Sequence, residues 1–461
     1  MILQILIGIF GLGLVIFVHE AGHLIVAKLV GIEVEAFSIG WGKRLTGFTF
    51  RGTDYRLSLI PLGGYCKMKG ETALQSAIEN DQTEIPKDKG AFYTARPWQR
   101  ILVLLAGPTM NLLFALVVLS IVWYSGFTIQ TFGNKVVLES DFPSSVSAPP
   151  YPATQAGIRT GDTILSIGGT AVKDFRDIEQ AVAPNPGTPL PFKVRTPNGA
   201  IQTLTVDPAL NKNSGAGRIG VYPWIEPIVS TVQPAAAAAG FLPGDRIVAL
   251  DGQPVTQSIQ YQHLLESIAA KSSSVTVTVM RDGQRKEFSA PITPAVTSGK
   301  SARPPILGLS FKALTVQTPH YTLIQAIGKG SHETFRTLGL TINGIGLLFR
   351  GVNVTNAVAG PVRITYLVGE ATTQGFAAGA KEGFVSFFNF LSLLSVVLFF
   401  MNLLPIPLLD GGQILLSLIE GVSRRPLRPR YVHRYQMVGV IIVFMLIFFA
   451  FFNDIIYFVR Q

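Results

Sequence analysis

Three residues near the N-terminus have the types and the spacing of a metal-dependent hydrolytic site. The stretch FVHEAGHLIVAK, residues 17–28, contains His19, Glu20 and His23. Residues four apart lie on one face of a helix, so the two imidazoles can converge on one metal ion, and neutral nitrogen ligands suit zinc. Glu20 stands beside them and can take a proton from a metal-bound water, whose pKa zinc lowers to about 7. The pattern predicts a zinc site with Glu20 as general base.

The position of this motif argues against a chance match. It follows an apolar run, residues 1–18, in which Gln4 is the only strongly polar side chain. Imidazole and charged groups are costly at membrane depth, so a chain that keeps them there has a use for them.

A catalytic zinc site also needs a third protein ligand and one open position. The other histidines lie far along the chain, and none is well placed: His263, His320, His332 and His433. A carboxylate in the segment NLLPIPLLDGG, residues 402–412, is better placed. This segment interrupts an apolar run with two prolines, an aspartate and two glycines.

The two prolines must break or kink the helix that contains them. Backbone freed in this way is tolerated within a membrane only where it is buried in protein or lines a cavity. Asp410 therefore projects from the break at Pro405 and Pro407 into the protein interior. We expect His19, His23 and Asp410 to bind one zinc ion. The alternative is that Asp410 caps the helix after the break.

Apolar segments of membrane-spanning length must position these residues. Of the 461 residues, 48% are hydrophobic and only 14% are charged, against about 25% charged in an ordinary soluble domain. The first apolar segment lacks the basic start and the cleavage site of a signal peptide, so we expect a retained helix. The sequence predicts a polytopic α-helical membrane protein with four transmembrane helices. The apolar windows are 2–24, 101–124, 384–409 (continuing past its break to about 419) and 436–459.

The distribution of basic residues predicts how the chain crosses the membrane. The net charge is +10, but the basic residues form no nucleic-acid recognition element and instead lie beside the apolar segments, as in Arg424 and Arg425. Placing the basic loops 28–100 and after Glu420 in the cytoplasm puts both chain ends and region 128–383 outside. The single cysteine, Cys66, allows no intrachain disulfide.

The central region contains an internal repeat. PATQAGIRTGDTILSIGGTAV (152–172) aligns with PAAAAAGFLPGDRIVALDGQPV (234–255), and Gly157, Gly161 and Asp162 recur 83 residues later. Each copy then reaches a turn signal, Asn-Gly or Asp-Gly, between β-branched runs. We expect two inserted β-rich domains, 128–225 and 226–312, which from the pattern alone could be structural and bind no ligand. We expect the linker 313–383 to contain an amphipathic helix at 335–351. This helix would lie on the membrane surface or against the bundle and would not form a fifth span.

Taken together, these motifs resemble the site-2 protease family of intramembrane zinc metalloproteases. The resemblance rests on His-Glu-x-x-His in the first helix and on Asn-x-x-Pro-x-Pro-x-Leu-Asp-Gly in a later one. FSIGWGK (37–43), PLGGYCKM (61–68) and AGPTMNLLFA (106–115) match further family motifs. The two repeats, each with a Gly-x-x-x-Gly-Asp core, resemble tandem PDZ domains inserted between the second and third spans.

The resemblance implies roles for individual residues. Zinc would be bound by the two histidines and Asp410, and Asn402 would bind the unwound substrate backbone. Related sequences often have a second asparagine about one turn earlier, where this chain has Val396-Val397. The segment TDYRLSLIPLGGYCKM, residues 53–68, would be a hairpin that offers a strand edge to an extended substrate, the alternative being a packing role only. The remaining residues expected at the substrate site are Pro405, Pro407, Gly63 and Gly64.

The function that the resemblance implies is regulated intramembrane proteolysis at the bacterial inner membrane, with one zinc ion per chain. The expected partners are the lipid bilayer and single-span membrane substrates, such as anti-sigma factors of the envelope stress response and remnant signal peptides. The PDZ-like domains would be periplasmic and exclude bulky substrates, and the active site would lie towards the cytoplasm. One alternative is a catalytically idle PDZ scaffold, against which the intact motif argues. Another is an ion transporter, which would explain neither Glu20 nor the repeats.

Overall fold

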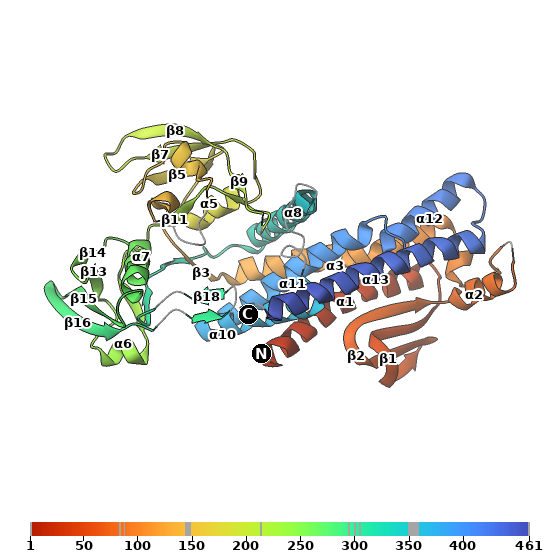
Figure 1. The fold of residues 1–461 in the computed structure, drawn as a ribbon. Coiled ribbons are helices and arrows are strands. Elements are labelled where there is room, and N and C mark those ends of the chain that lie inside the picture. Colours follow the sequence, from red (N-terminus) through yellow and green to blue (C-terminus); the bar gives the residue numbers. More distant parts are fainter. Residues whose placement is uncertain are drawn as a thin grey trace. The chain divides into compact units, whose positions relative to one another are not determined.

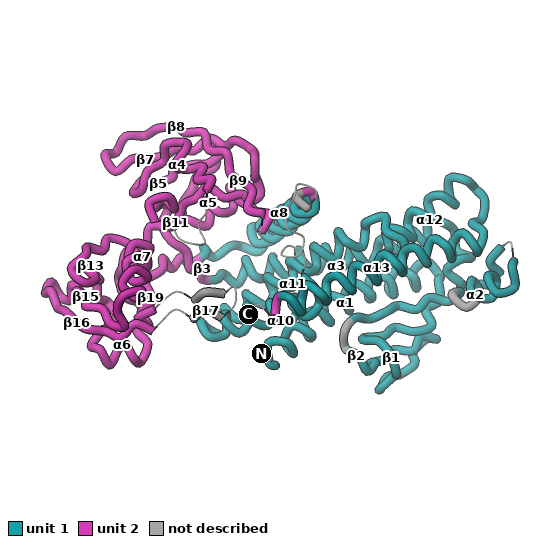
Figure 2. Tube along the Cα trace, in the orientation of Figure 1, with its two compact units in different colours: residues 1–127, 318–345, 358–456 teal, residues 128–317, 346–357, 457–461 magenta. Residues whose placement is uncertain are grey.

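The computed structural model describes residues 2–82, 84–86, 88–142, 149–212, 214–293, 296–298, 301–303, 306–348 and 359–459. The chain forms two compact units (Figure 2). The helical unit comprises residues 1–127, 318–345 and 358–456, and the β unit comprises residues 128–317, 346–357 and 457–461.

Four helices of the helical unit are long and apolar enough to cross a membrane (Figure 1). Among the described residues no other helix meets both conditions. The four predicted spans are therefore confirmed, and each helix extends beyond its apolar window except the third, which ends earlier. The chain is a polytopic membrane protein with additional β domains. The helices are α1 (Ile2–Leu29), α3 (Pro97–Ser125), α11 (Ala380–Leu403) and α13 (Pro429–Val459).

The predicted break after the third span is present, and the stretch expected to continue past it to about residue 419 lies in a helix of its own. Helix α11 ends at Leu403, and a separate helix, α12 (Asp410–Ser423), begins seven residues later. Pro405 and Pro407 cannot donate the backbone hydrogen bonds that would continue the helix. Leu408, which lies between them and α12, has a φ of 86°, a backbone conformation that a right-handed helix does not contain.

Strands β1 (Val34–Phe50) and β2 (Thr53–Met68) form the sheet of the helical unit. They meet at Arg51-Gly52, where both residues have positive φ, as a two-residue type I′ turn requires. Residues 36–39 pair on one side with 54–57 and on the other with 64–67. The two halves of the 53–68 segment thus flank the start of β1, and the prediction that they form a hairpin with each other is wrong. Two of the apolar side chains exposed on these strands are Trp41 and Phe48.

The linker between the β unit and the third span contains two helices. Helix α8 (Leu323–Leu348) begins earlier than the predicted 335–351 helix, and the last predicted residues lie outside the described ones. Helix α10 (Pro361–Ala378) was not expected from the sequence. It packs closely on α1, because a Cβ at Gly8 would lie 1.9 Å from the carbonyl oxygen of Thr365. The first turn of α10 is capped by Asp454 of α13, which accepts hydrogen bonds from the backbone N–H groups of Gly360, Val362 and Arg363.

The β unit contains two four-stranded sheets with the same pattern of connections. Their strand orders are β6-β5-β7-β8 and β14-β13-β15-β16. Each sheet has its own hydrophobic core, with Phe192 in one and Phe241 in the other. The strands are β5 (Thr163–Ile167), β6 (Thr170–Ala171), β7 (Leu190–Arg195), β8 (Ile201–Val206), β13 (Arg246–Leu250), β14 (Gln253–Pro254), β15 (Ser274–Arg281) and β16 (Gln284–Pro291). The internal repeat of the sequence is therefore also a repeat of structure.

Shorter elements complete both units. The paired short strands are β3 (Thr128–Thr131) with β20 (Leu314–Gln317), β4 (Val136–Leu138) with β11 (Val221–Pro223), β9 (Ala209–Leu210) with β10 (Gly217–Arg218), β12 (Val229–Val232) with β19 (Leu309–Phe311), and β17 (Val296–Ser298) with β18 (Ser301–Arg303). The remaining helices are α2 (Glu71–Glu79), η1 (Phe92–Thr94), η2 (Glu139–Asp141), α4 (Pro152–Gln155), α5 (Phe175–Val182), α6 (Pro234–Ala238) and α7 (Ser258–Ala269).

The repeated aspartate of the Gly-x-x-x-Gly-Asp core has different partners in the two repeats. Asp245 accepts hydrogen bonds from the Arg281 guanidinium at 2.6 and 2.8 Å and from the backbone N–H of Leu242 at 2.9 Å. Burial raises the pKa of Asp245, but these donors together lower it by more than burial raises it. The pKa therefore lies below its ordinary value. The equivalent Asp162 accepts from the N–H of Arg159, while its Oδ1 atom is buried without a hydrogen-bond partner among the described residues.

Candidate active site

The first helix places both histidines on one buried face. His19 is 8% exposed and His23 is 5% exposed, and their Nε2 atoms are 3.2 Å apart. Asp410, at the start of α12, directs Oδ2 at the same point, 3.2 Å from His19 Nε2 and 3.5 Å from His23 Nε2. The structure thus brings together three residues that the sequence separates by up to 391 positions.

The chemistry and spacing of these three atoms fit zinc. Zinc binds histidine nitrogen and carboxylate oxygen at about 2.0–2.2 Å with tetrahedral geometry, so neighbouring ligand atoms lie roughly 3.3 Å apart. The three separations here, 3.2, 3.2 and 3.5 Å, match that spacing. Asp410 Oδ2 is buried, and no described residue donates a well-formed hydrogen bond to it, as expected for an atom whose partner is a cation. Three protein ligands would leave one position open, as in catalytic zinc sites.

Asp410 does not cap its helix. It is the first residue of α12, the capping position belongs to Leu409, and no side chain there bonds to the helix N–H groups. Two glycines after Asp410 bring the helix start close to the preceding break. A Cβ at Gly411 would lie 2.3 Å from the Leu403 carbonyl oxygen, and one at Gly412 would lie 2.2 Å from that of Ile406. The Asp-Gly-Gly sequence therefore fixes where the carboxylate points.

A glycine on α3 makes room for His23. A Cβ at Gly107 would lie 2.2 Å from His23 Nε2, so only glycine allows the ring its present position. The other ring nitrogen, Nδ1, lies 2.8 Å from the carbonyl oxygen of Val103, one turn earlier on α3. This acceptor keeps the proton on Nδ1 and leaves Nε2 free to bind a metal.

Glu20 lies beside the histidines and next to the sheet. Its carboxylate accepts a hydrogen bond from the backbone N–H of Cys66 in β2. A Cβ at Gly64 would be 3.6 Å from Glu20 Cγ, so the last part of β2 runs along the helix at the position of the proposed base. Glu20 does not belong to the group of converging metal-ligand atoms.

The family profile described as peptidase family M50 matches residues 7–446 of the chain. The chain belongs to peptidase family M50. The resemblance to site-2 proteases seen in the sequence motifs is thereby confirmed.

Relatives of this M50 peptidase match over nearly their whole length. It is 36% identical over 455 residues to a putative zinc metalloprotease of Treponema pallidum. This match covers 98% of this chain and 99% of the relative. It is 32% identical over 466 residues to the regulator of sigma E protease of Salmonella typhi, and 30% identical over 465 residues to the regulator of sigma-E protease RseP of Escherichia coli K12. Both matches cover 97% of each chain.

The residues expected to contact substrate in this M50 peptidase have different environments. Asn402 lies in the last turn of α11, partly exposed, and the described residues offer its amide no hydrogen-bond partner. Pro405 is exposed, whereas Pro407 is buried and packs against Gly439 of α13. Gly63 has a φ of 104° and lies under the Trp41 ring. Pro407 thus has a packing position, and substrate contact stays a proposal for the others.

Asn111 of the M50 peptidase is a site residue to which sequence reasoning gave no role. It is fully buried on α3, with its amide nitrogen 3.3 Å from His19 Nδ1, and its Oδ1 has no hydrogen-bond partner in the described part of the chain. When His19 Nε2 binds a metal, Nδ1 carries the ring proton and needs an acceptor. Amide orientation is assigned from such bonds. Turning the Asn111 amide by half a turn places Oδ1 where it can accept the proton of His19 Nδ1, so we assign Oδ1 as the acceptor. An asparagine within an apolar span was the available signal.

Proposed function

We propose that this M50 peptidase is an intramembrane zinc endopeptidase that cleaves the transmembrane segments of single-span proteins. The observation that carries the proposal is the convergence of His19, His23 and Asp410 beside Glu20. The two histidines and Glu20 lie on α1, a helix long and apolar enough to span a membrane. The names of the relatives, zinc metalloprotease and regulator of sigma-E protease, support both the metal and the reaction class. We propose one zinc ion per chain.

Each residue of the cluster has a distinct part in peptide hydrolysis. Zinc, when bound, supplies a water acidic enough to be deprotonated at neutral pH. Glu20 takes that proton and passes it to the leaving amine nitrogen, which a positioned carboxylate can do in sequence. Val103 and Asn111 hold the two imidazoles by their Nδ1 atoms. Glu20 is itself held by the N–H of Cys66, so the base has a fixed direction.

Substrate must be unwound before cleavage, because a transmembrane helix hides its peptide groups in internal hydrogen bonds. The segment 64–67 of β2 pairs on one side with residues 36–39, has no strand partner on its other side among the described residues, and runs past Glu20. An extended substrate can add to this segment as another strand, with backbone hydrogen bonds that replace those lost from its helix. Asn402, whose amide can both donate and accept, can bind a further unpaired backbone group. Both contacts belong to the proposal.

The two β domains support a second part of the proposal. We infer that they are PDZ-like, lie on the periplasmic side of the bacterial inner membrane, and exclude substrates whose outer domain is still attached. The repeated sheet order and the repeated Gly-x-x-x-Gly-Asp core support a pair of similar domains. Anti-sigma factors, after loss of their outer domain, and remnant signal peptides are substrates of suitable form.

The proposal is tested by locating the cut. The purified full chain is incubated in membranes with a single-span substrate in water enriched in oxygen-18, and the products are analysed by mass spectrometry. We expect one new carboxyl end that carries oxygen-18 and lies inside the apolar segment, with no product from Glu20→Gln protein. A cut confined to the polar flanks, or a labelled product made equally by Glu20→Gln protein, would contradict the proposal.

A further inference from the structure

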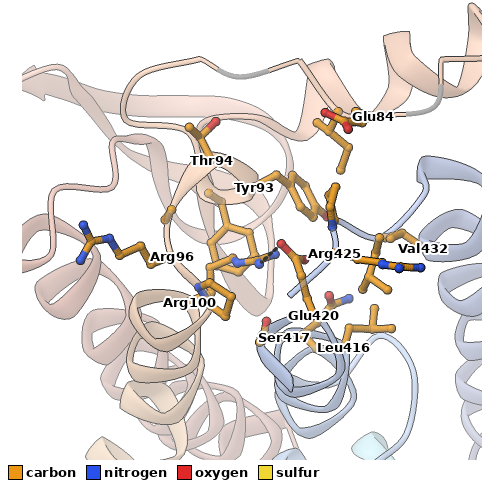
Figure 3. A pocket seen from close by; sticks show the side chains of 18 of the residues that line it. Glu84, Tyr93, Thr94, Arg96, Arg100, Leu416, Ser417, Glu420, Arg425 and Val432 are labelled. Carbon is orange, nitrogen blue, oxygen red and sulfur yellow. Dashed lines mark ion pairs between the residues drawn. The ribbon is translucent and has the colours of Figure 1, made fainter. Parts of the chain in front are cut away.

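A basic pocket lies at the other end of α12 from Asp410. It has a volume of about 430 Å³ and is formed by the start of α3, the last turns of α12 and the loop that follows. Four arginines and two glutamates line it, which leaves a net positive charge of two. Figure 3 shows the pocket with Arg100 and Glu420 at its base. None of the residues of the proposed metal site lines it.

Arg100 is the buried charge of this pocket. Its side chain is 4% exposed and makes one ion pair, 2.8 Å from Nη2 to Glu420 Oε1. Its Nε atom is buried and has no hydrogen-bond partner in the described part of the chain. A buried guanidinium with an unused N–H is costly unless something accepts from it. Glu420 neutralises Arg100, so the remaining charge of the pocket comes mainly from its exposed arginines.

Three of those arginines have no acidic partner. Arg96 lines the pocket next to the start of α3, and Arg424 and Arg425 line it after the end of α12. No ion pair joins any of these three arginines to a described carboxylate. The first turn of α3 adjoins Arg96, so the positive end of that helix dipole also faces the pocket. Guanidinium groups around a helix N-terminus form a setting that binds phosphate oxygens.

The pocket lies beside the ends of candidate membrane spans, where lipid headgroups are expected. It adjoins the first turns of two candidate spans, α3 and α13, and each carries an exposed aromatic residue there, Trp98 at 52% and Tyr431 at 59%. Tryptophan and tyrosine gather at membrane–water interfaces. Basic pockets between helices at this level bind anionic lipid headgroups.

We propose that this pocket binds the phosphate of an anionic phospholipid headgroup, with Arg100 at its base and Arg424 and Arg425 as the outer donors. The site is separate from the proposed metal cluster, and the proposal does not depend on proteolysis. A soluble phosphate ester offers the same chemistry and is distinguished by the experiment below.

The test measures lipid binding by native mass spectrometry of the full chain in a neutral detergent. The probes are short-chain phosphatidylglycerol, phosphatidylcholine and glycerol 3-phosphate. Arg424→Gln/Arg425→Gln removes two donors from the pocket. Arg428→Gln/Arg434→Gln removes the same charge from exposed residues nearby that do not line it. Arg100 is left intact, because its loss would strand Glu420 in the protein.

We expect phosphatidylglycerol to bind at least ten-fold more tightly than phosphatidylcholine. The pocket variant should lose at least ten-fold of that affinity, and the control variant less than two-fold. Equal losses in the two variants would show diffuse attraction to basic residues and would overturn the proposal. Equal affinity for phosphatidylcholine, or binding of glycerol 3-phosphate as tight as that of phosphatidylglycerol, would overturn the assignment to an anionic lipid.

Discussion

Replacement of Asn111 by leucine tests whether the metal cluster depends on the group that orients His19. Leucine has the same branched arrangement of heavy atoms as asparagine, so the change removes the acceptor without opening a cavity. Asn111 is fully buried and 3.3 Å from His19 Nδ1, so bulk solvent does not reach the amide that the substitution removes. A buried N–H left without an acceptor costs about 1–3 kcal/mol. Partners of this kind typically change metal affinity by roughly 10–100-fold, and that range corresponds to about 1.4–2.7 kcal/mol. The two estimates agree.

The assay is a zinc competition titration of the full chain in detergent against a chelator of known affinity, with far-UV circular dichroism to check folding. Asn111→Leu should raise the zinc dissociation constant by 10–100-fold. Asn111→Asp keeps an acceptor and should bind zinc at least as well as the wild type. Ser392→Ala serves as the matched control, because Ser392 is buried on α11 and its hydroxyl donates to the Phe388 carbonyl oxygen of the same helix. Zinc affinity unchanged in a folded Asn111→Leu protein would refute the orienting role.

Three further results follow from the same structure. Gly107→Ala should displace the His23 ring and abolish zinc binding, because the added Cβ would lie 2.2 Å from His23 Nε2. Gly13→Ala is the control and should leave the zinc affinity unchanged, because an added Cβ there would have no atom within 4 Å. Asn402→Ala should keep its zinc but lose most cleavage, and a proline added to the substrate span should restore part of it; equal rates on poly-leucine and proline-containing spans would contradict the unwinding argument. Asp245→Asn should cost about 2–3 kcal/mol of β-domain stability and Asp162→Asn less, because Asp245 alone has an arginine partner. The pKa of Asp245 is lowered in the folded protein, so its contribution to stability is complete above the ordinary carboxyl pKa and is lost as the pH falls through the folded pKa. The melting temperatures of the wild type and Asp245→Asn should therefore converge at low pH.

The parts of the site that the sequence predicts are those with a local cause. His19 and His23 share a face because they are four residues apart on a helix, and the apolar context makes their presence costly. The break before Asp410 follows from Pro405 and Pro407, whose effect on a helix needs no knowledge of the fold. Membrane spans follow from the length of apolar runs.

The parts that were missed depend on contacts distant in sequence. Gly107 and Asn111 act on histidines more than 80 positions away, and only the helix packing brings them together. Helix α10 has a weak apolar pattern and depends on Asp454, 94 residues from Gly360, for its first turn. The pairing of residues 36–39 with both halves of β2 likewise follows from the sheet as a whole.

The central claim is that Glu20 is the base of a zinc site whose ligands are His19, His23 and Asp410. The most direct measurement compares zinc content and cleavage of a single-span substrate in wild-type, Glu20→Gln and Asp410→Ala proteins. We predict that Glu20→Gln retains about one zinc per chain, as a three-ligand site requires, and cleaves nothing, while Asp410→Ala loses both the metal and the activity. Cleavage by Glu20→Gln protein, or full zinc content in Asp410→Ala protein, would contradict the account.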